Sequence, residues 1–309
     1  MVETHRPLCQ HSVRNPGRRA LITHEQIPDF YDWLSRYVQL SNWLSYRHRF
    51  AAFTMHKRLD VSTQAGGAGG RTAGLEYVNE RLLEVATLPP EPRVLDAGCG
   101  FGGTVFHWQR RIGGRYDGLT LSRVQLRVAR REARRRGIED SCRFHLQSYD
   151  AALERDFDAV VAIESLIHAA DLDRTVQNLA SALRPGGVLL ILDDMATGDL
   201  DRVRPAEAAL LHAHWGCARY STQEHYRAAL CRARLTLIHE EDLSSLMVPR
   251  DEHILDRWES VYSNLYRAIP LSPVRTVLSA FLGGIALERL HGSGDVHYRL
   301  FVARRTGKA

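Results

Sequence analysis

A glycine-rich segment directly after a short apolar run is the feature that most constrains the fold of this chain. It reads Val94-Leu95-Asp96-Ala97-Gly98-Cys99-Gly100-Phe101-Gly102-Gly103. The apolar run predicts a buried strand. The glycines allow a sharp turn into a helix and let a ligand approach the main chain closely. Because Gly98, Gly100 and Gly103 also satisfy G-x-G-x-x-G, a dinucleotide site has to be considered.

Strand-like and helix-like segments alternate through the middle of the chain. Short apolar runs predict strands at 93–97, 115–120, 142–147, 158–163 and 188–193. Amphipathic segments, such as 122–136, predict the helices between them. This order predicts an α/β fold with a parallel, doubly wound, Rossmann-like sheet. Ligands of such sheets bind beyond the carboxyl ends of the strands.

The pattern changes after residue 194. Helices are expected near 204–214, 221–233, 251–268 and 273–290, and strands at 235–242 and 296–303. The two strands complete a predicted seven-stranded sheet with an antiparallel last strand. The helices are expected to form substrate-cap insertions at about 195–233 and 245–292.

The first 71 residues differ in character from the rest. Residues 1–24 are polar, basic and aperiodic, which is typical of a mobile tail. Residues 25–71 contain an aromatic helical pattern that begins at Asp29, and they end in the glycine-rich stretch 66–70. We therefore expect a helical lid segment over 25–71, a flexible hinge, and a main domain over 72–309 that opens with a helix to residue 86.

Composition excludes several classes of protein. No apolar run approaches the roughly 20 residues of a membrane helix. The N-terminus lacks the apolar stretch of a secretory signal. The five cysteines have no metal-ligand or redox spacing, so we expect a cytoplasmic protein without a structural metal. The net charge of +5 and six arginines within 127–136 leave nucleic-acid binding open as an alternative.

The Asp-Ala-Gly-Cys-Gly core of the glycine segment resembles the first motif of class I S-adenosylmethionine (SAM) methyltransferases. In that family the acid lies on the strand and the glycines cradle the amino-acid part of SAM. The resemblance implies cofactor contacts by Asp96, Gly98, Cys99 and Gly100. A carboxylate there would repel a pyrophosphate but suits the ammonium and sulfonium of SAM. A nicotinamide-dependent oxidoreductase stays a rival interpretation.

The second and third strands end in segments that fit the same cofactor. Gly118-Leu119-Thr120-Leu121-Ser122, followed by Gln125, lacks the ribose-binding acid of many methyltransferases but resembles enzymes that methylate alkenes. That resemblance implies a ribose contact by Gln125, with Thr120, Leu121 and Ser122 beside it. Gln147, Ser148 and Tyr149 would flank the adenine, within reach of Asp150. An exposed helical glutamine and a core tyrosine are the structural alternatives.

The fourth strand leads into Ala162-Ile163-Glu164-Ser165-Leu166-Ile167-His168-Ala169, which resembles a segment of sterol C-methyltransferases. An alkene that takes a methyl cation becomes a carbocation and must then lose a proton. A carboxylate can stabilise the cation and accept the proton. We therefore expect Glu164 to be catalytic, His168 to orient it or relay the proton, and Ile163 to border the cofactor. A helix-capping glutamate and a packed histidine are the alternatives.

Aromatic and basic residues are candidates for substrate binding. The segment Phe30-Tyr31-Asp32 resembles the Tyr-Tyr-Asp that opens many of these enzymes, which would place Tyr31 at the cofactor. An apolar slot with cations at one end would suit a prenyl diphosphate of the geranyl or farnesyl type, with Mg²⁺ possible. The candidates for this slot are Trp43, Tyr46, Arg49, Phe53, His56, Lys57, Trp215, Tyr262 and Tyr266. Aromatic residues that pack in the hydrophobic core would show the same helical spacing. N- or O-methylation of another small acceptor stays open as an alternative. A homodimer also stays open.

Overall fold

The computed structural model describes residues 24–44, 57, 59–62, 73–217 and 220–306, with side chains omitted at 24, 42–44 and 73. The predicted tail and the glycine-rich hinge lie outside these residues. The helices are α1 (Ile27–Leu44), α2 (Ala73–Ala86), α3 (Gly103–Ile112), α4 (Arg123–Arg136), α5 (Leu172–Ala182), α6 (Leu200–Val203), α7 (Pro205–Trp215), α8 (Gln223–Arg232), α9 (Glu252–Ala268) and α10 (Ser272–Gly292). Three short 3-10 turns are η1 (His24–Gln26), η2 (Leu166–His168) and η3 (Ser244–Leu246).

A mixed seven-stranded sheet forms the centre of the molecule. Its strands are β1 (Arg93–Ala97), β2 (Arg115–Thr120), β3 (Cys142–Leu146), β4 (Phe157–Ile163), β5 (Leu183–Ala196), β6 (Leu235–Asp242) and β7 (Val296–Arg305). They lie in the order β3-β2-β1-β4-β5-β7-β6. Strands β1 to β5 pair in parallel, whereas β7 is antiparallel to both of its neighbours. The predicted sheet is therefore confirmed, antiparallel last strand included.

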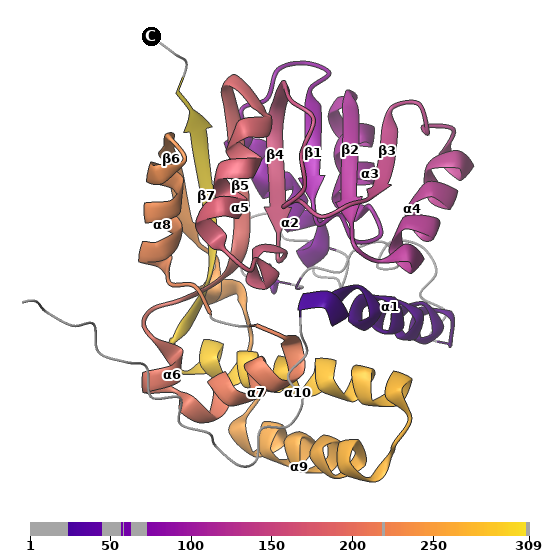
Figure 1. Ribbon diagram of the computed structural model, residues 1–309, viewed down its shortest axis with the longest axis vertical. Helices are drawn as coiled ribbons and strands as arrows, with labels where there is room; N and C mark the ends of the chain where they lie inside the picture. The colour runs from indigo at the N-terminus through magenta and orange to yellow at the C-terminus, as the bar shows by residue number, and fades with distance from the viewer. Residues whose placement is uncertain (1–23, 45–56, 58, 63–72, 218–219, 307–309) are drawn as a thin grey trace, which may run out of the picture.

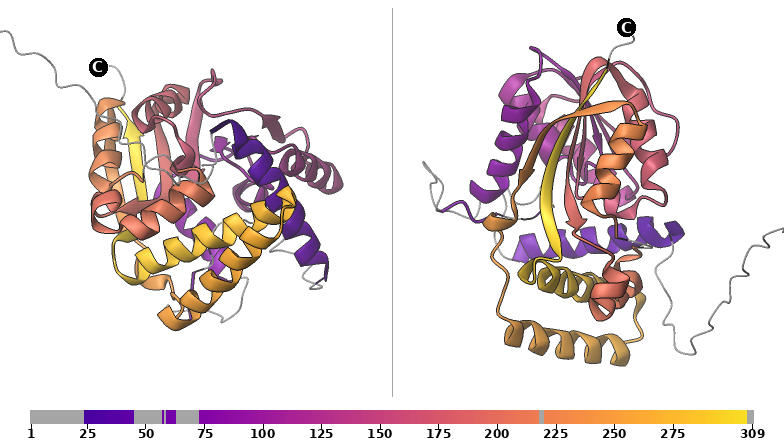
Figure 2. Two further views of the ribbon diagram at one scale, coloured as in Figure 1. Left: turned by 60° about the horizontal axis from the view of Figure 1, so that its bottom comes forward. Right: turned by 90° about the vertical axis from the view of Figure 1, so that its left-hand side faces the viewer.

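Helices cover both faces of the sheet because successive strand residues point to opposite sides. Val188 and Leu190 of β5 face the side covered by α2, α3 and α4, and Leu189 and Ile191 face the side covered by α5 and α8. Figures 1 and 2 show these layers. Each face is apolar, so the parallel strands are buried on both sides, as parallel strands usually are.

A third group of helices lies beyond the carboxyl ends of the parallel strands. Figure 1 shows α1, α6, α7, α9 and α10 below the sheet, at the end to which the arrowhead of β4 points. Helix α1 contacts α4 and α10, and α10 contacts α7 and α9. Residues from α6, α7 and α10 share a small core with the end of β5 and the start of β7. These helices form a cover over the ligand-binding edge of the sheet.

Local sequence signals set the helix ends. Ser122, Asp171 and Thr222 cap α4, α5 and α8, each by accepting a hydrogen bond from a backbone N–H in the first turn. Gly137 ends α4 with a positive φ of 66°. The arginines of α4 are partly used within the fold: Arg135 and Arg136 bind Glu132, and Arg130 donates to the Phe144 carbonyl. Their charge is therefore less available than the sequence indicates.

Strand β5 differs most from its predicted bounds. It runs from Leu183 to Ala196 rather than over 188–193, so the stretch Arg184–Gly187 falls within it. This stretch is irregular, since Gly186 has a φ of +81° and the register with β4 shifts between Phe157 and Ala159. The other strands differ from their predicted bounds by at most two residues at either end.

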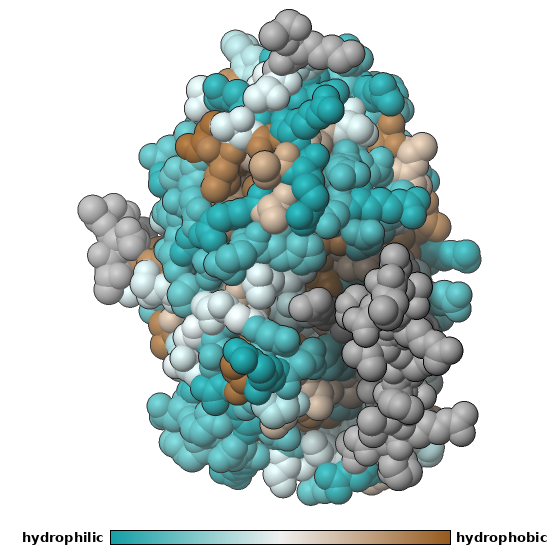
Figure 3. Space-filling view, turned by 60° about the vertical axis from the view of Figure 1, so that its left-hand side comes forward, coloured by the Kyte–Doolittle hydropathy of each residue, from teal (hydrophilic) through white to brown (hydrophobic). Residues whose placement is uncertain are grey.

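The surface is mostly polar where Figure 3 shows it, with hydrophobic residues in small separate patches. Within the described residues, no helix combines the length and apolar character needed to cross a membrane.

Candidate active site

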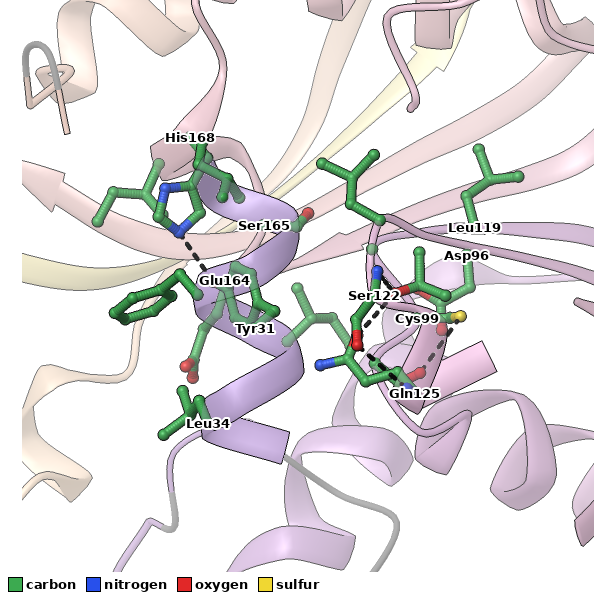
Figure 4. A pocket seen from close by; sticks show the side chains of 18 of the residues that line it. Tyr31, Leu34, Asp96, Cys99, Leu119, Ser122, Gln125, Glu164, Ser165 and His168 are labelled. Carbon is green, nitrogen blue, oxygen red and sulfur yellow. Dashed lines mark hydrogen bonds between the residues drawn. The ribbon is translucent and has the colours of Figure 1, made fainter. Parts of the chain in front are cut away.

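A cavity of about 450 Å³ opens at the carboxyl ends of β1, β2, β4 and β5. Its walls include residues of α1, α7 and α10, so the helical cover closes over the ends of the strands. Figure 4 shows two groups of side chains: Asp96, Cys99, Ser122 and Gln125 on one side, and Tyr31, Leu34, Glu164 and His168 on the other. The first group comes from the end of β1, the glycine turn and the start of α4, and the second from α1 and the segment after β4.

The glycine turn allows close packing between β1 and the segment after β4. Gly98 has a φ of +111°, and a Cβ there would lie 2.5 Å from Cβ of Ser165. The Ser165 hydroxyl donates to the Ala97 carbonyl at 2.7 Å, which fixes the two segments together. A side chain at position 98 would push them apart.

Asp96 is a buried carboxyl group at the end of β1. Its exposed fraction is 4%, and burial raises its pKa to about 7. A carboxyl group in this state is stabilised in its charged form when a cation binds beside it. The ammonium and sulfonium of SAM meet that requirement, so the residues present fit the cofactor that the sequence implies.

The ribose end of the predicted cofactor site is ordered by short hydrogen bonds. Thr120 Oγ1 donates to Gln125 Oε1 at 2.6 Å and thereby orients the amide, and both side chains are buried. Asp32 of α1 accepts hydrogen bonds from the Ser122 hydroxyl and from the Val124 backbone N–H at the start of α4. Helix α1 is thus attached directly to the predicted cofactor loop, a contact that the sequence did not indicate.

The predicted adenine residues separate into two groups. Gln147 and Tyr149 line the cavity, and the Tyr149 hydroxyl donates to the Ser165 carbonyl at 2.9 Å. Ser148 is not among the lining residues, and its hydroxyl accepts the Asp150 backbone N–H at 3.0 Å. The Asp150 carboxylate accepts a hydrogen bond from Thr175. The other predicted cofactor residues all line the cavity: Tyr31, Asp96, Gly98, Cys99, Gly100, Thr120, Leu121, Ser122, Gln125 and Ile163.

Glu164 lines the same cavity and is held by three donors. Its Oε1 accepts the Lys57 backbone N–H at 2.7 Å and the Tyr298 hydroxyl at 2.8 Å. Its Oε2 lies 3.5 Å from the Lys57 ammonium. The backbone of Glu164 has a φ of +47°, a strained region for a residue with a side chain, and strain of this kind clusters at functional sites. These contacts fix the direction of the carboxylate.

Two further carboxyl groups lie behind Glu164 at the end of β5. Asp194 accepts hydrogen bonds from the Lys57 ammonium and from His291 Nε2, the latter at 2.8 Å. Burial raises the pKa of Asp194, but the two basic partners outweigh it and hold this pKa below its usual range. Asp193 accepts the backbone N–H of Leu166, and burial together with Asp194 raises its pKa to about 8.

His168 is paired with a residue of α1. Its Nε2 lies 2.8 Å from the Tyr31 hydroxyl, and the two rings meet edge to face at a centroid distance of 5.5 Å. Figure 4 shows this hydrogen bond. The described hydrogen bonds of Glu164 come from Lys57 and Tyr298 instead. The predicted orientation of Glu164 by His168 therefore stays a prediction.

The rest of the cavity wall is mostly apolar. Trp215 and Lys57 are the predicted substrate residues that line it, and unpredicted lining residues include Ile27, Phe30, Leu34, Tyr37, Val38 and Phe281. Tyr262 and Tyr266 are not lining residues: Tyr262 stacks on Phe281, and Tyr266 packs against His214. The side chain of Trp43 and all of Tyr46, Arg49, Phe53 and His56 lie outside the described residues.

Sequence reasoning missed Tyr298, Asp194 and His291. Asp194 of β5 lines the cavity, whereas Tyr298 of β7 contacts Glu164 and His291 of α10 contacts Asp194 from behind the lining. No local motif joins these residues to Glu164. One signal was available: Asp193 and Asp194 are consecutive acids at the end of a buried strand, where parallel sheets bind their ligands. The lysine prediction also changes, because Lys57 pairs with carboxylates and is not held ready for a diphosphate.

Comparison with known proteins identifies the family. A family model described as a methyltransferase domain matches residues 95–189. Methyltransferase GfsG of Streptomyces halstedii is 32% identical over 195 residues, which cover 62% of this chain and 69% of that relative. The chain belongs to the SAM-dependent methyltransferases. It is an enzyme, and SAM is its methyl donor.

More distant relatives show what this membership leaves open. Geranyl diphosphate 2-C-methyltransferase of Saccharopolyspora erythraea is 30% identical over 173 residues, covering 55% of this chain and 60% of that relative. A crystal structure of geranyl diphosphate C-methyltransferase from Streptomyces coelicolor shares the fold, with a TM-score of 0.68, 21% identity and coverage of 92% and 98%. Other relatives are named as sterol C-, N- and O-methyltransferases. The reaction class is therefore known, and the acceptor is not.

Proposed function

We propose that this enzyme transfers the SAM methyl group to an alkene carbon of an isoprenoid acceptor, with prenyl diphosphates of the geranyl or farnesyl type as the first candidates. One observation carries the proposal: the Glu164 carboxylate is held in a fixed direction within a mostly apolar, aromatic-walled cavity beside the predicted cofactor loop. An apolar wall of this kind suits an uncharged acceptor carbon. A carboxylate in this position suits the cationic intermediate that forms when that carbon is methylated.

The chemistry follows from the charges. SAM supplies an electrophilic methyl group; the alkene π-electrons form the new C–C bond, and the S–CH₃ bond breaks. The positive charge then rests on the neighbouring carbon. Aromatic faces such as those of Phe30, Tyr31 and Trp215 each stabilise a cation by roughly 0.5–2 kcal/mol. Glu164 then accepts a proton from an adjacent carbon, and the electrons of that C–H bond restore the double bond.

The charges of the cavity wall restrict where the diphosphate end of the acceptor can lie. Among the described lining residues, the carboxyl groups of Asp96, Glu164, Asp193 and Asp194 outnumber the one lysine. A diphosphate beside Glu164 would be repelled. The isoprenoid chain would therefore occupy the apolar wall. The predicted cations Arg49 and His56 lie outside the described residues. Mg²⁺ would accompany the diphosphate if the acceptor carries one, and activity should then require the ion.

Glu164→Gln tests the base. With SAM and geranyl or farnesyl diphosphate, we expect kcat to fall by about 10²-fold or more, because the amide neither accepts the proton nor stabilises the cation. Product mass (a gain of one CH₂) and NMR would identify the methylated carbon. SAM affinity should change little. Unaltered turnover by the glutamine variant, on any acceptor that the wild type methylates at carbon, would remove the role given to this carboxylate.

Methylation at oxygen or nitrogen is the second candidate, and one observation favours it. His168 lies in the cavity in a hydrogen bond with Tyr31, and an imidazole is a competent base for an acceptor hydroxyl or amine. Glu164, by contrast, already accepts hydrogen bonds from two donors and pairs with a third, so both of its oxygens are engaged.

The same product analysis separates the two candidates. An O- or N-methyl signal in the NMR spectrum, together with a larger loss of kcat in His168→Gln than in Glu164→Gln, would favour the second. A C-methyl signal with the opposite order would favour the first.

A further inference from the structure

Lys57 joins segments that are far apart in the sequence. Its backbone N–H donates to Glu164 at 2.7 Å, and its ammonium lies 3.5 Å from the other oxygen of the same carboxylate. The ammonium also donates to Asp194 of β5 and lies 5.0 Å from the ring centroid of Tyr298 on β7. One residue thus contacts both oxygens of the predicted catalytic group and connects it to two strands.

The surroundings of Lys57 are strongly anionic. Glu164 faces it from the segment after β4, and Asp193 and Asp194 face it from β5. His291 reaches Asp194 from α10, and Tyr298 faces Lys57 from β7. Burial lowers the pKa of Lys57, but Asp194 and Glu164 outweigh it and hold this pKa well above its usual range. The ammonium therefore keeps its charge and separates carboxylates that would otherwise repel one another.

The residue type also carries information. The chain has two lysines, Lys57 and Lys308, and its other long basic side chains are all arginines. A lysine ammonium is a compact point charge, whereas guanidinium is a wide planar fork. The compact group fits a contact shared by Asp194, Glu164 and the face of Tyr298, and a fork would have to displace one of them.

We propose that Lys57 is a positioning residue for the methyl transfer: it holds the Glu164 carboxylate directed at the reacting carbon. This inference rests on the proposed function, because it takes Glu164 as the group that acts on the acceptor. Lys57 itself stays bound to the two carboxylates and takes no proton from the substrate.

Lys57→Met tests the proposal, since methionine keeps much of the side-chain volume and removes the charge. We expect kcat to fall about 10-fold or more with KM changed far less. Lys57→Arg keeps the charge, so its kcat should fall less than that of Lys57→Met.

Arg204→Met is the matched control. Arg204 pairs with Asp295 outside the cavity, so its loss removes an ion pair without touching the site, and kcat should stay as in the wild type. If Lys57→Met does not fold, Lys57→Gln removes the same charge and retains a polar group. A kcat equal to that of the wild type in the folded variant would overturn the proposal.

A readout without acceptor separates this test from that of the proposed function. The ¹³C signal of the Glu164 carboxyl carbon can be assigned by its absence in Glu164→Gln and then compared between variants. In Lys57→Met its chemical shift should move, because the ammonium no longer lies beside the carboxylate, and in Arg204→Met it should stay as in the wild type. That result would support the positioning role even if Glu164→Gln left turnover intact, which would reject only the proposed base. An unchanged chemical shift in Lys57→Met would reject the role of Lys57.

Discussion

Asp96 shows how a single buried carboxyl group can link cofactor binding to pH. Its pKa is raised to about 7 by burial, whereas an aspartate in an unfolded chain titrates near 3.9. Between these values the folded protein binds a proton that the unfolded chain has released. The contribution of Asp96 to stability is therefore present at low pH and is lost as the pH rises from about 4 to about 7.

SAM affinity should show the opposite trend. The cationic cofactor favours the charged form of Asp96, so we expect the Kd for SAM to fall as the pH rises from about 5.5 to 7.5, with proton release on binding. Asp96→Asn should weaken binding about 10-fold or more and flatten this dependence. Calorimetry in buffers of different ionisation enthalpy measures both quantities. Asp117→Asn is the control, because Asp117 lies outside the cavity. If the Kd for SAM depended on pH in Asp96→Asn as it does in the wild type, the prediction would be contradicted.

Helix α10 offers a matched pair of glycines for testing how the cover is packed. A Cβ on Gly283 would lie 2.1 Å from Cδ1 of Trp215, a residue of α7 that lines the cavity. A Cβ on the next residue, Gly284, would meet nothing within 4 Å. The Trp215 indole also donates to the Ala280 carbonyl at 3.1 Å, so it cannot move away without losing that bond. The close contact between α7 and α10 therefore requires that position 283 carries no side chain.

Gly283→Ala should therefore destabilise the protein, by about 1–3 kcal/mol in the free energy of unfolding, because the indole must shift. It should also raise KM for the acceptor, since Trp215 forms part of the wall. Gly284→Ala should be neutral or stabilising by up to about 1 kcal/mol, since alanine favours helices. Urea denaturation of both variants compares them directly. Equal stabilities would mean that the close approach of Trp215 does not constrain position 283.

At the scale of the whole molecule, the sequence predicted the features that depend on residues close together in the chain. The strands β1 and β2 lie where apolar runs end in the glycine turn and in Thr120, and all predicted cofactor residues except Ser148 line one cavity. Local periodicity and turn chemistry are sufficient for this. The contacts of Glu164 could not be predicted from local patterns, because Lys57 and Tyr298 lie 107 and 134 residues away in sequence. Only the packed fold brings these groups together.

The cofactor prediction can be tested on the intact protein by linkage between binding and unfolding. Ligand at 100 times its Kd stabilises the folded state by about 2.7 kcal/mol, which for a protein of this size raises Tm by about 5 °C. SAM should produce such a shift, and NAD at the same concentration should not, because Asp96 would repel its pyrophosphate. Glu164→Gln should keep the SAM shift, since its change lies on the acceptor side of the cavity. A rise in Tm with NAD and none with SAM would instead indicate that the glycine turn binds a dinucleotide.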